Sequence, residues 1–214
     1  VIARSRDEAR LLIKGVGIHP RKVKIVLNGV NPPGPVDIEG VRREFAIEGD
    51  FALHVSMFTQ RRKNVARLIE AIGPLGIPLL IGGLAGPAGE GDDVYAAAKK
   101  FPRVRFLGRL TAAQRDSLYA ACRVFCLPSI FEGTGLVALE AASHGALVVI
   151  TRNGGPPDYF GDFAEYVDPR NIASIRASIE SAWNEPRDGA LQAHVLNHLS
   201  WENSARALAA AYGA

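Results

Sequence analysis

Cysteine, long apolar runs and net charge are all scarce in this sequence, and each shortage excludes a class of protein. Only 2 of the 214 residues are cysteine, too few for a disulfide framework in a domain of this size. Cys122 and Cys126 lie at a predicted helix end and in the following strand, where we expect buried free thiols. No apolar run reaches the length of a membrane span, and the start, Val1 to Arg4, lacks the pattern of a signal peptide. We therefore expect a cytoplasmic protein. A location at the inner face of a membrane is an alternative that the sequence does not exclude.

Charges of the two signs nearly cancel. The chain has 25 basic and 22 acidic residues, a formal net charge of +3. This small excess is too diffuse to predict a nucleic-acid partner, although it leaves room for anionic ligands or membrane surfaces. Hydrophobic residues make up 48% of the chain, which is enough to form a core. Internal repeats, low-complexity tracts and the metal-binding Asp-x-Asp motif are absent from the sequence.

What the sequence does contain is a regular alternation of short apolar runs with segments of helical period. The apolar runs predict strands at 22–27, 51–57, 79–82, 104–107, 124–127, 147–150 and 165–167. Apolar residues at three- and four-residue spacing predict helices at 63–72, 94–101, 111–121 and 136–145, and Thr111 suits the N-cap of the third. Strands that are apolar on both faces and alternate with helices predict an α/β fold: a doubly wound, Rossmann-like parallel sheet with its ligand cleft at the carboxyl ends of the strands.

Composition divides the chain into three parts. The turn-rich stretch that begins at Asn28-Gly29 and contains several prolines predicts an interdomain linker over residues 28–50. Residues 1–27 predict a helix and a strand with too little surface to fold alone. Because the chain also starts without Met, we expect these residues to be a remnant of an absent amino-terminal domain. Residues 51–214 form the main domain, and its tail from Asn171 to Tyr212 predicts three helices, with Pro186 separating the first two.

The most informative motif is Phe131-Glu132-Gly133-Thr134-Gly135-Leu136-Val137-Ala138-Leu139-Glu140, which directly follows a predicted strand. Gly133 and Gly135 let the backbone approach a ligand closely, and a helix starting near Gly135 offers free amides and positive dipole character to an anion. Glu132 in the loop can accept hydrogen bonds from sugar hydroxyls, and Glu140 in the helix can reach a diol such as ribose. Taken alone, the spacing is also compatible with an ordinary loop glutamate and a helix-surface glutamate.

The chain resembles, over essentially its whole length, the carboxyl-terminal, donor-binding half of retaining GT-B glycosyltransferases of group 1. The most specific match is the paired-glutamate motif from Glu132 to Glu140, which follows Pro128-Ser129 and precedes Gly145. The other matches fall in the expected order: Lys24–Val30 as the interdomain strand, Arg61-Arg62-Lys63-Asn64 as the phosphate-binding cluster, Phe106-Leu107-Gly108, Asn153-Gly154-Gly155-Pro156 as the Gly-Gly turn, and Ser200-Trp201-Glu202 as the closing helix.

The resemblance implies a role for each of these residues. Glu132 would act on the donor sugar, and Arg62 and Lys63 would hold the diphosphate, where fixed cations stabilise the charge that builds on the leaving group. Glu140 would bind the ribose hydroxyls. The loop and helix start would contact the sugar and the distal phosphate through Gly133 and the amides of Thr134, Gly135, Leu136 and Val137, with Arg61 as a further phosphate ligand.

The resemblance also implies the partners. The ligand would be a nucleotide-sugar, UDP- or GDP-linked, with no cofactor and no metal ion. A glycan or lipid-linked acceptor would bind to the absent amino-terminal domain, so the isolated chain is expected to be inactive. The full-length enzyme would serve glycan, polysaccharide or glycolipid synthesis, and its peripheral association with a membrane stays open.

The chain departs from the family pattern in three places. Ser56-Met57 stands where many relatives have Gly-Arg, so one diphosphate arginine is missing and Arg61 or Arg62 is expected to replace it. Thr134 stands in place of an aromatic residue, which changes the sugar pocket. Asp158 ends the Gly-Gly turn after two prolines, so the role of the carboxylate found there in relatives is in doubt.

Two other functions stay open: a sugar-nucleotide epimerase of similar fold, and a non-catalytic nucleotide-binding module. The glycine-rich stretch 82–89 lacks the Gly-x-Gly-x-x-Gly spacing of a dinucleotide site, so we expect an ordinary loop there. His194 and His198 have the spacing of zinc ligands on a helix but lack the accompanying catalytic glutamate, so we expect no metal there either.

Overall fold

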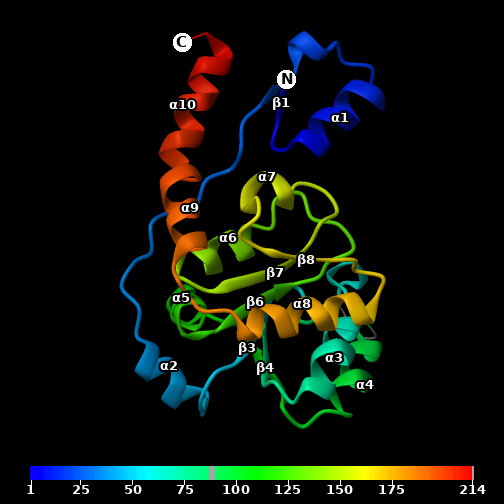
Figure 1. Cartoon of the computed structure of the whole chain (residues 1–214), viewed down its shortest axis with the longest axis vertical. Coiled ribbons are helices and arrows are strands. Elements are labelled where there is room, and N and C mark those ends of the chain that lie inside the picture. Colours follow the sequence, from blue (N-terminus) through cyan, green and yellow to red (C-terminus); the bar gives the residue numbers. More distant parts are fainter. Residues whose placement is uncertain (87–89, 214) are drawn as a thin grey trace.

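A parallel sheet of six strands forms the centre of the computed structural model, which describes residues 1–86 and 90–213 (Figure 1). The strands are β3 (Ala52–Val55), β4 (Leu79–Gly82), β5 (Val104–Gly108), β6 (Val124–Leu127), β7 (Leu147–Thr151) and β8 (Glu165–Val167). They coincide with six of the seven predicted strands, and the α/β fold is confirmed. Part of the glycine-rich stretch, residues 87–89, lies outside the described residues.

The strand order β5-β4-β3-β6-β7-β8 places the switch point of the sheet between β3 and β6. From β3 the chain moves outward through β4 to β5, and it then returns to β6 and moves outward the other way. All neighbouring strands pair in parallel. In such sheets the loops that leave two adjacent strands in opposite directions open a crevice at the carboxyl ends. The loops after β3 and β6 therefore form the expected position for a ligand.

Helices cover both faces of the sheet because the strands are apolar on both faces. On one side, Leu68 of α3 and Ile175 of α8 pack with Ile81 and Val149 in a core that also includes α4. On the other side, helices α2, α5, α6 and α9 pack on alternate strand residues such as Leu53, Phe125 and Ile150. The helices are α2 (Ile38–Glu44), α3 (Val65–Ile72), α4 (Asp92–Ala98), α5 (Ala112–Ala121), α6 (Leu136–Ser143), α7 (Pro156–Phe160), α8 (Ile172–Asn184) and α9 (Ala190–His198).

The first predicted helix begins later than expected. Residues 61–63 form the 3-10 turn η2 (Arg61–Lys63), and α3 starts only at Val65. Asn64 between them adopts a left-handed conformation with φ 61°, which an α-helix cannot contain. The third helix begins as predicted, because Thr111 caps α5 with a capping box that includes Gln114.

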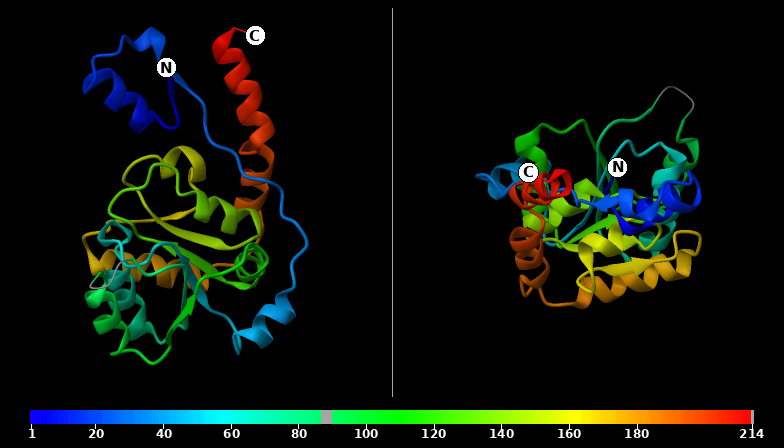
Figure 2. Two further views of the ribbon diagram at one scale, coloured as in Figure 1. Left: turned by 180° about the vertical axis from the view of Figure 1, so that it is seen from behind. Right: turned by 90° about the horizontal axis from the view of Figure 1, so that it is seen from above.

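The segments at the two ends of the chain extend from the same side of the sheet (Figures 1 and 2). Residues 1–27 form a small unit in which β1 (Ile2–Ala3) pairs with β2 (Lys24–Ile25), joined by α1 (Arg6–Lys14) and η1 (Pro20–Lys22). The last helix, α10 (Trp201–Tyr212), runs beside the start of the linker, where Ser204 donates a hydrogen bond to the Leu27 carbonyl at 2.6 Å. The sequence predicted a strand at 22–27, and the structure forms only its short central part.

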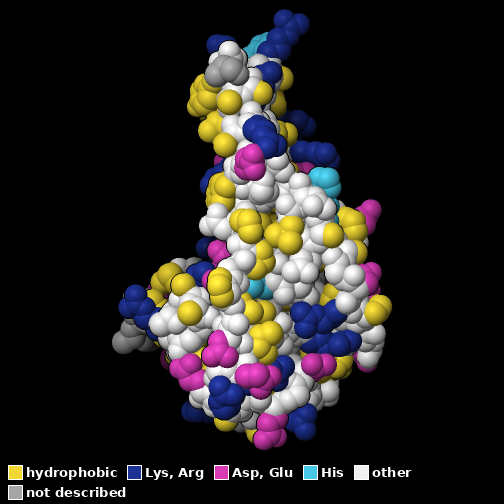
Figure 3. Space-filling model, turned by 90° about the vertical axis from the view of Figure 1, so that its left-hand side faces the viewer, with side chains coloured by type: hydrophobic (Ala, Val, Ile, Leu, Met, Phe, Trp, Pro, Cys, Tyr) yellow, Lys and Arg dark blue, Asp and Glu magenta, His cyan; other side chains and the backbone are white. Residues whose placement is uncertain are grey.

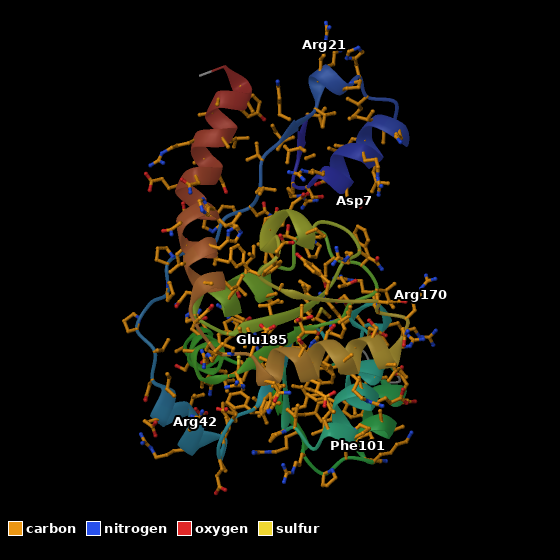
Figure 4. The ribbon with its side chains drawn as sticks, viewed as in Figure 1. Asp7, Arg21, Arg42, Phe101, Arg170 and Glu185 are labelled. Carbon is orange, nitrogen blue, oxygen red and sulfur yellow. The ribbon has the colours of Figure 1, made fainter. Side chains whose placement is uncertain are left out.

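This end of the molecule exposes several large hydrophobic side chains. Val1, Leu11, Val16, Ile25, Trp201, Leu208 and Tyr212 are all exposed, and hydrophobic side chains are visible over the narrow upper end in Figure 3. In Figure 4, Arg21 marks the far end of this unit, and Asp7 lies on the side of α1 that is nearer to the sheet. No helix among the described residues is both long and apolar enough to cross a membrane.

Candidate functional site

The loop after β3 brings a cationic side chain into the crevice. Lys63 is only 9% exposed, whereas the side chain of its neighbour Arg62 is 57% exposed. Asn64 fixes this turn, since its side-chain amide donates to the carbonyls of Pro128 at 2.9 Å and Pro169 at 2.6 Å. The Asn64 side chain thus ties the turn that carries Lys63 to the end of β6.

The loop after β6 supplies the matching carboxylate. Glu132 is 7% exposed, and its Oε1 accepts hydrogen bonds from Lys63 Nζ at 2.6 Å and from Ser129 Oγ at 2.6 Å. Arg62 approaches the same oxygen at 3.7 Å. Within the described part of the chain, the other oxygen, Oε2, has no hydrogen-bond partner. The structure therefore brings three of the predicted residues, Arg62, Lys63 and Glu132, to one point between β3 and β6.

The glycines around Glu132 let two loops approach closely. Glu132 forms an isolated parallel bridge with Gly154, and Gly155 N–H donates to the Glu132 carbonyl at 3.0 Å. A Cβ on Gly154 would lie 2.0 Å from that carbonyl oxygen, and one on Gly155 would lie 1.9 Å from the Gly133 oxygen. The Gly-Gly turn is therefore required where it packs against the backbone of the paired-glutamate motif.

The helix that follows begins at the predicted place. Gly135, with φ 79°, is the residue before α6, a conformation that favours glycine. No side chain caps the start of this helix, so the amides of Leu136 and Val137 keep the free N–H groups of a helix N-terminus. Gly133 faces open space, because no heavy atom of residues 1–86 and 90–213, apart from Gly133 and its two chain neighbours, lies within 4 Å of the position that a Cβ would take.

Glu140 lies farther along α6 and has different neighbours. Its Oε2 accepts a hydrogen bond from the Tyr119 hydroxyl at 3.3 Å and lies 3.7 Å from Arg115 Nε. Burial, together with the Glu140 charge, raises the pKa of Tyr119 well above its usual value. Glu140 lines a hollow of about 150 Å³ with Arg115, His144, Trp201 and the start of the linker. The structure thus separates the surroundings of Glu140 from the Lys63–Glu132 pair.

Arg61 faces another hollow. It lines a space of about 780 Å³ together with Arg62 and with acidic residues near the start of α4, namely Glu90, Asp92 and Asp93. Arg62 borders both this space and the Lys63–Glu132 pair. Arg61 and Arg62 thus share this space with three carboxylates, and of the two arginines only Arg62 also approaches Glu132.

Two further buried residues, Ser129 and His54, lie at the site and were not predicted from the sequence as site residues. Ser129, fully buried, donates to Glu132, and the Pro-Ser that ends β6 was the available signal. His54 in β3 is also fully buried, with Nδ1 2.7 Å from the Cys126 carbonyl and Nε2 2.6 Å from Ser56 Oγ. Burial lowers the pKa of His54 to about 4, against the opposing effect of the hydrogen bond to Cys126. A histidine inside an otherwise apolar strand was the signal for it.

Other histidines with candidate roles have structural contacts. His194 Nε2 lies 2.9 Å from the Tyr159 carbonyl, and the His194 and His198 rings are 5.3 Å apart. Among residues 1–86 and 90–213, no group of three or more His, Cys, Asp or Glu side chains is arranged to hold a metal ion.

Comparisons with known proteins identify the family of this chain. A family model described as "Glycosyl transferases group 1" matches residues 40–195. The O-antigen chain mannosyltransferase B of Escherichia coli is 30% identical over 189 residues, which cover 80% of this chain and 48% of that protein. The D-inositol 3-phosphate glycosyltransferase of Thermobifida fusca (strain YX) is 32% identical over an alignment of 237 residues, which covers 99% of this chain and 54% of that protein. The chain spans about half the length of these curated relatives.

Solved structures have the same fold. The sucrose-phosphate synthase from Thermosynechococcus elongatus superimposes with a TM-score of 0.81 at 21% identity, covering 100% of this chain and 57% of that one. Anabaena HepE in complex with UDP and glucose gives a TM-score of 0.83 at 22% identity, covering 100% and 62%.

Proposed function

Because the chain belongs to the glycosyl transferases group 1 family, we propose that its six-stranded domain binds a nucleotide-sugar and supplies the donor half of a sugar-transfer site. The observation that carries the proposal is the Lys63–Glu132 pair, 2.6 Å apart, at the switch point of the parallel sheet. The Glu132 Oε2 atom, which has no hydrogen-bond partner among the described residues, and the neighbouring Arg62 are available for a sugar and for a phosphate.

The chemistry follows from these charges. Breaking the bond between the anomeric carbon and the diphosphate builds negative charge on the leaving group. Arg62 and Lys63 stabilise that charge, and the amides of Gly135, Leu136 and Val137 at the start of α6 add the positive end of a helix dipole. Glu132 accepts hydrogen bonds from the sugar through Oε2. No metal ion is needed in this scheme, because protein cations supply the counter-charge. Transfer with retention of the anomeric configuration is part of the proposal.

Glu140 binds the ribose hydroxyls in this proposal. Its side chain is 34% exposed, so a diol can reach it without displacing the protein core. Tyr119 and Arg115 hold the carboxylate in place from the other side. The donor nucleotide is a UDP- or GDP-sugar. The known complex of Anabaena HepE with UDP and glucose supports the first, and the mannosyltransferase relatives are compatible with the second.

The acceptor binds outside the six-stranded domain. We assign residues 28–50 as the linker and residues 1–27 as part of an amino-terminal domain that holds a glycan or lipid-linked acceptor. The hydrophobic side chains exposed on residues 1–27 and on α10 support this assignment, because such a surface fits a neighbouring domain. In this proposal, the full-length protein is a cytoplasmic enzyme of glycan, polysaccharide or glycolipid synthesis.

Calorimetry with UDP-glucose, GDP-mannose and the corresponding nucleoside diphosphates tests the donor site. Arg62→Ala should weaken sugar nucleotide and diphosphate alike, by about 1.5–3 kcal/mol for a charge-assisted contact. Glu140→Ala should likewise weaken both, since ribose is common to both.

Glu132→Gln should weaken binding of the sugar nucleotide and leave binding of the diphosphate nearly unchanged. Glu180→Ala on the exposed face of α8 is the matched control. Parent-like binding by Glu140→Ala would overturn the assignment of the paired glutamates.

A further inference from the structure

A hydrogen-bond network joins the loop of residues 131–135, referred to below as the glycine loop, to segments that are far away in the sequence. Tyr159 on α7 is fully buried, and its hydroxyl donates to the Arg4 carbonyl at 2.6 Å. The same hydroxyl accepts from the Asn28 backbone N–H at 3.0 Å and from the Thr134 hydroxyl at 3.3 Å. The Asn28 side-chain amide donates to the Thr134 oxygen at 3.0 Å. The groups of these four residues are referred to below as the Tyr159 network.

Each hydroxyl in this network uses its hydrogen-bonding capacity. A tyrosine or threonine hydroxyl has one proton to donate. Tyr159 gives its proton to Arg4 and accepts two, whereas Thr134 gives its proton to Tyr159 and accepts one. Thr134 is only 7% exposed, so a lost partner would leave a buried polar group unsatisfied. The Thr134 proton is therefore committed to the network and not to a ligand.

The network holds one side of the loop while the other side stays open. Gly133 faces open space, and Thr134, the next residue, points into the network. The Glu132 end of the loop is already fixed by its bridge to Gly154. On the other side, a Cβ on Gly135 would lie 2.9 Å from Ile150. Between these two ends, the hydrogen bonds of the Thr134 hydroxyl hold the backbone of residues 133–134 in position.

We propose that Asn28, Thr134 and Tyr159 are positioning residues that hold the Gly133–Thr134 backbone at the sugar end of the donor site. This inference rests on the proposed function, together with the sugar contact of Gly133 and the Thr134 amide that the family resemblance implies. Arg62 and Glu140, which bind phosphate and ribose in the proposal, are not part of the network. Loss of the network should therefore reduce affinity for the sugar portion of a donor and spare the nucleotide portion.

Hydrogen exchange on the ligand-free chain tests the anchoring step. Tyr159→Phe removes the hydroxyl and keeps the ring, so peptides that cover 131–137 and 26–30 should exchange at least about threefold faster. Thr134→Val should do the same, and Thr134→Ser, which keeps the hydroxyl, should restore the parent rate. Tyr166→Phe is the control, because its hydroxyl donates to the Gly161 carbonyl at 2.8 Å and has no contact with the network. Unchanged exchange in both disruptive variants would overturn the inference whether or not a donor binds.

Calorimetry tests the consequence. With UDP-glucose and UDP, and with GDP-mannose and GDP, Tyr159→Phe and Thr134→Val should weaken the sugar nucleotide about five- to tenfold. The diphosphate should change less than twofold, and Thr134→Ser should again resemble the parent. Equal losses for sugar nucleotide and diphosphate would indicate a general structural role and overturn the inference. If the parent chain bound neither pair, the proposed function would fail, and the anchoring step would still be judged by the exchange rates.

Discussion

Lys63 and Glu132 combine burial with charge, and each depends on the other for compensation. Their side chains are 11% and 8% exposed. Removing Lys63 therefore leaves Glu132 with the more distant and exposed Arg62, and removing the Glu132 charge leaves Lys63 without its carboxylate partner in a poorly solvated place. The pair is held by the 2.6 Å hydrogen bond and by Ser129. A mutation at either residue should therefore affect folding as well as the proposed ligand binding, and the two effects need separate measurements.

We predict that Lys63→Met and Glu132→Gln are strongly non-additive in stability. Each single change should lower the free energy of unfolding, Lys63→Met by about 3–5 kcal/mol because the buried Glu132 charge loses its closest partner and keeps only the largely exposed Arg62, 3.7 Å away. The double variant should be markedly more stable than the sum predicts, since no uncompensated charge remains. Urea unfolding of the four chains gives the interaction energy. Additive losses would show that Glu132 is well solvated without Lys63.

His54 should make the stability of the chain depend on pH in a defined window. Its pKa in the folded chain is about 4, lowered by burial from an ordinary value near 6.5. Between these values the unfolded chain binds a proton that the folded chain does not, so stability falls as pH decreases from about 6.5 to about 4. The His54 contribution is at most about 3 kcal/mol. His54→Gln cannot titrate, so its unfolding free energy should depend less steeply on pH in this range than that of the parent. Identical slopes would contradict the prediction.

At the scale of secondary-structure elements, the start of α6 depends on the backbone of one glycine. Gly135→Ala places a side chain at φ 79° and 2.9 Å from Ile150, which should cost about 1–2 kcal/mol or more in unfolding free energy. Gly133→Ala is the matched control, because its Cβ would enter open space at an ordinary φ. It should change stability by less than about 0.5 kcal/mol and reduce sugar-nucleotide binding. Thermal unfolding and calorimetry separate the two effects, and equal stability losses would be inconsistent with this account.

The strands of the sheet could be predicted because each is apolar on both faces and is bounded by polar or glycine-rich turns. Thr111 marked the start of α5 through a local rule, which the structure confirms. Local rules failed where geometry depended on distant contacts. Asn64 leaves the helix because its side chain bonds Pro128 and Pro169, and α7 is a short helix with prolines at its start that has no periodic pattern to detect.

The candidate site could be predicted in part for the same reason. The motif from Glu132 to Glu140 is continuous in sequence, so its glycines and helix start could be located. The pairing of Lys63 with Glu132 joins residues 69 positions apart, and only the strand order brings them together. The anchoring of Thr134 by Asn28 spans 106 positions. Neither contact leaves a signal in the local sequence, which is why the role of Thr134 in the loop emerged only from the structure.

At the scale of the whole molecule, the two ends of the chain place the proposed site beside an exposed hydrophobic surface, on which the proposed amino-terminal domain would pack. The Tyr159 network connects residues 4 and 28 to the glycine loop, so residues 1–28 contact the back of the site. The hydrophobic side chains of α10 and of residues 1–27 are exposed around the same end. This geometry favours an acceptor that arrives on a neighbouring domain and meets a donor site that is already formed.

We predict that this chain binds a nucleotide-sugar and transfers nothing. The groups proposed to hold the donor lie within the six-stranded domain, whereas the chain spans about half the length of its curated relatives. Release of UDP or GDP from UDP-glucose or GDP-mannose reports transfer without knowledge of the acceptor. With glycan and lipid extracts as acceptors, the chain should bind donor in calorimetry and release no more diphosphate than Glu132→Gln does. A longer version that carries an amino-terminal domain should release it steadily. Release above the Glu132→Gln level by the present chain that also depends on the added acceptor would show that the acceptor site lies within these 214 residues.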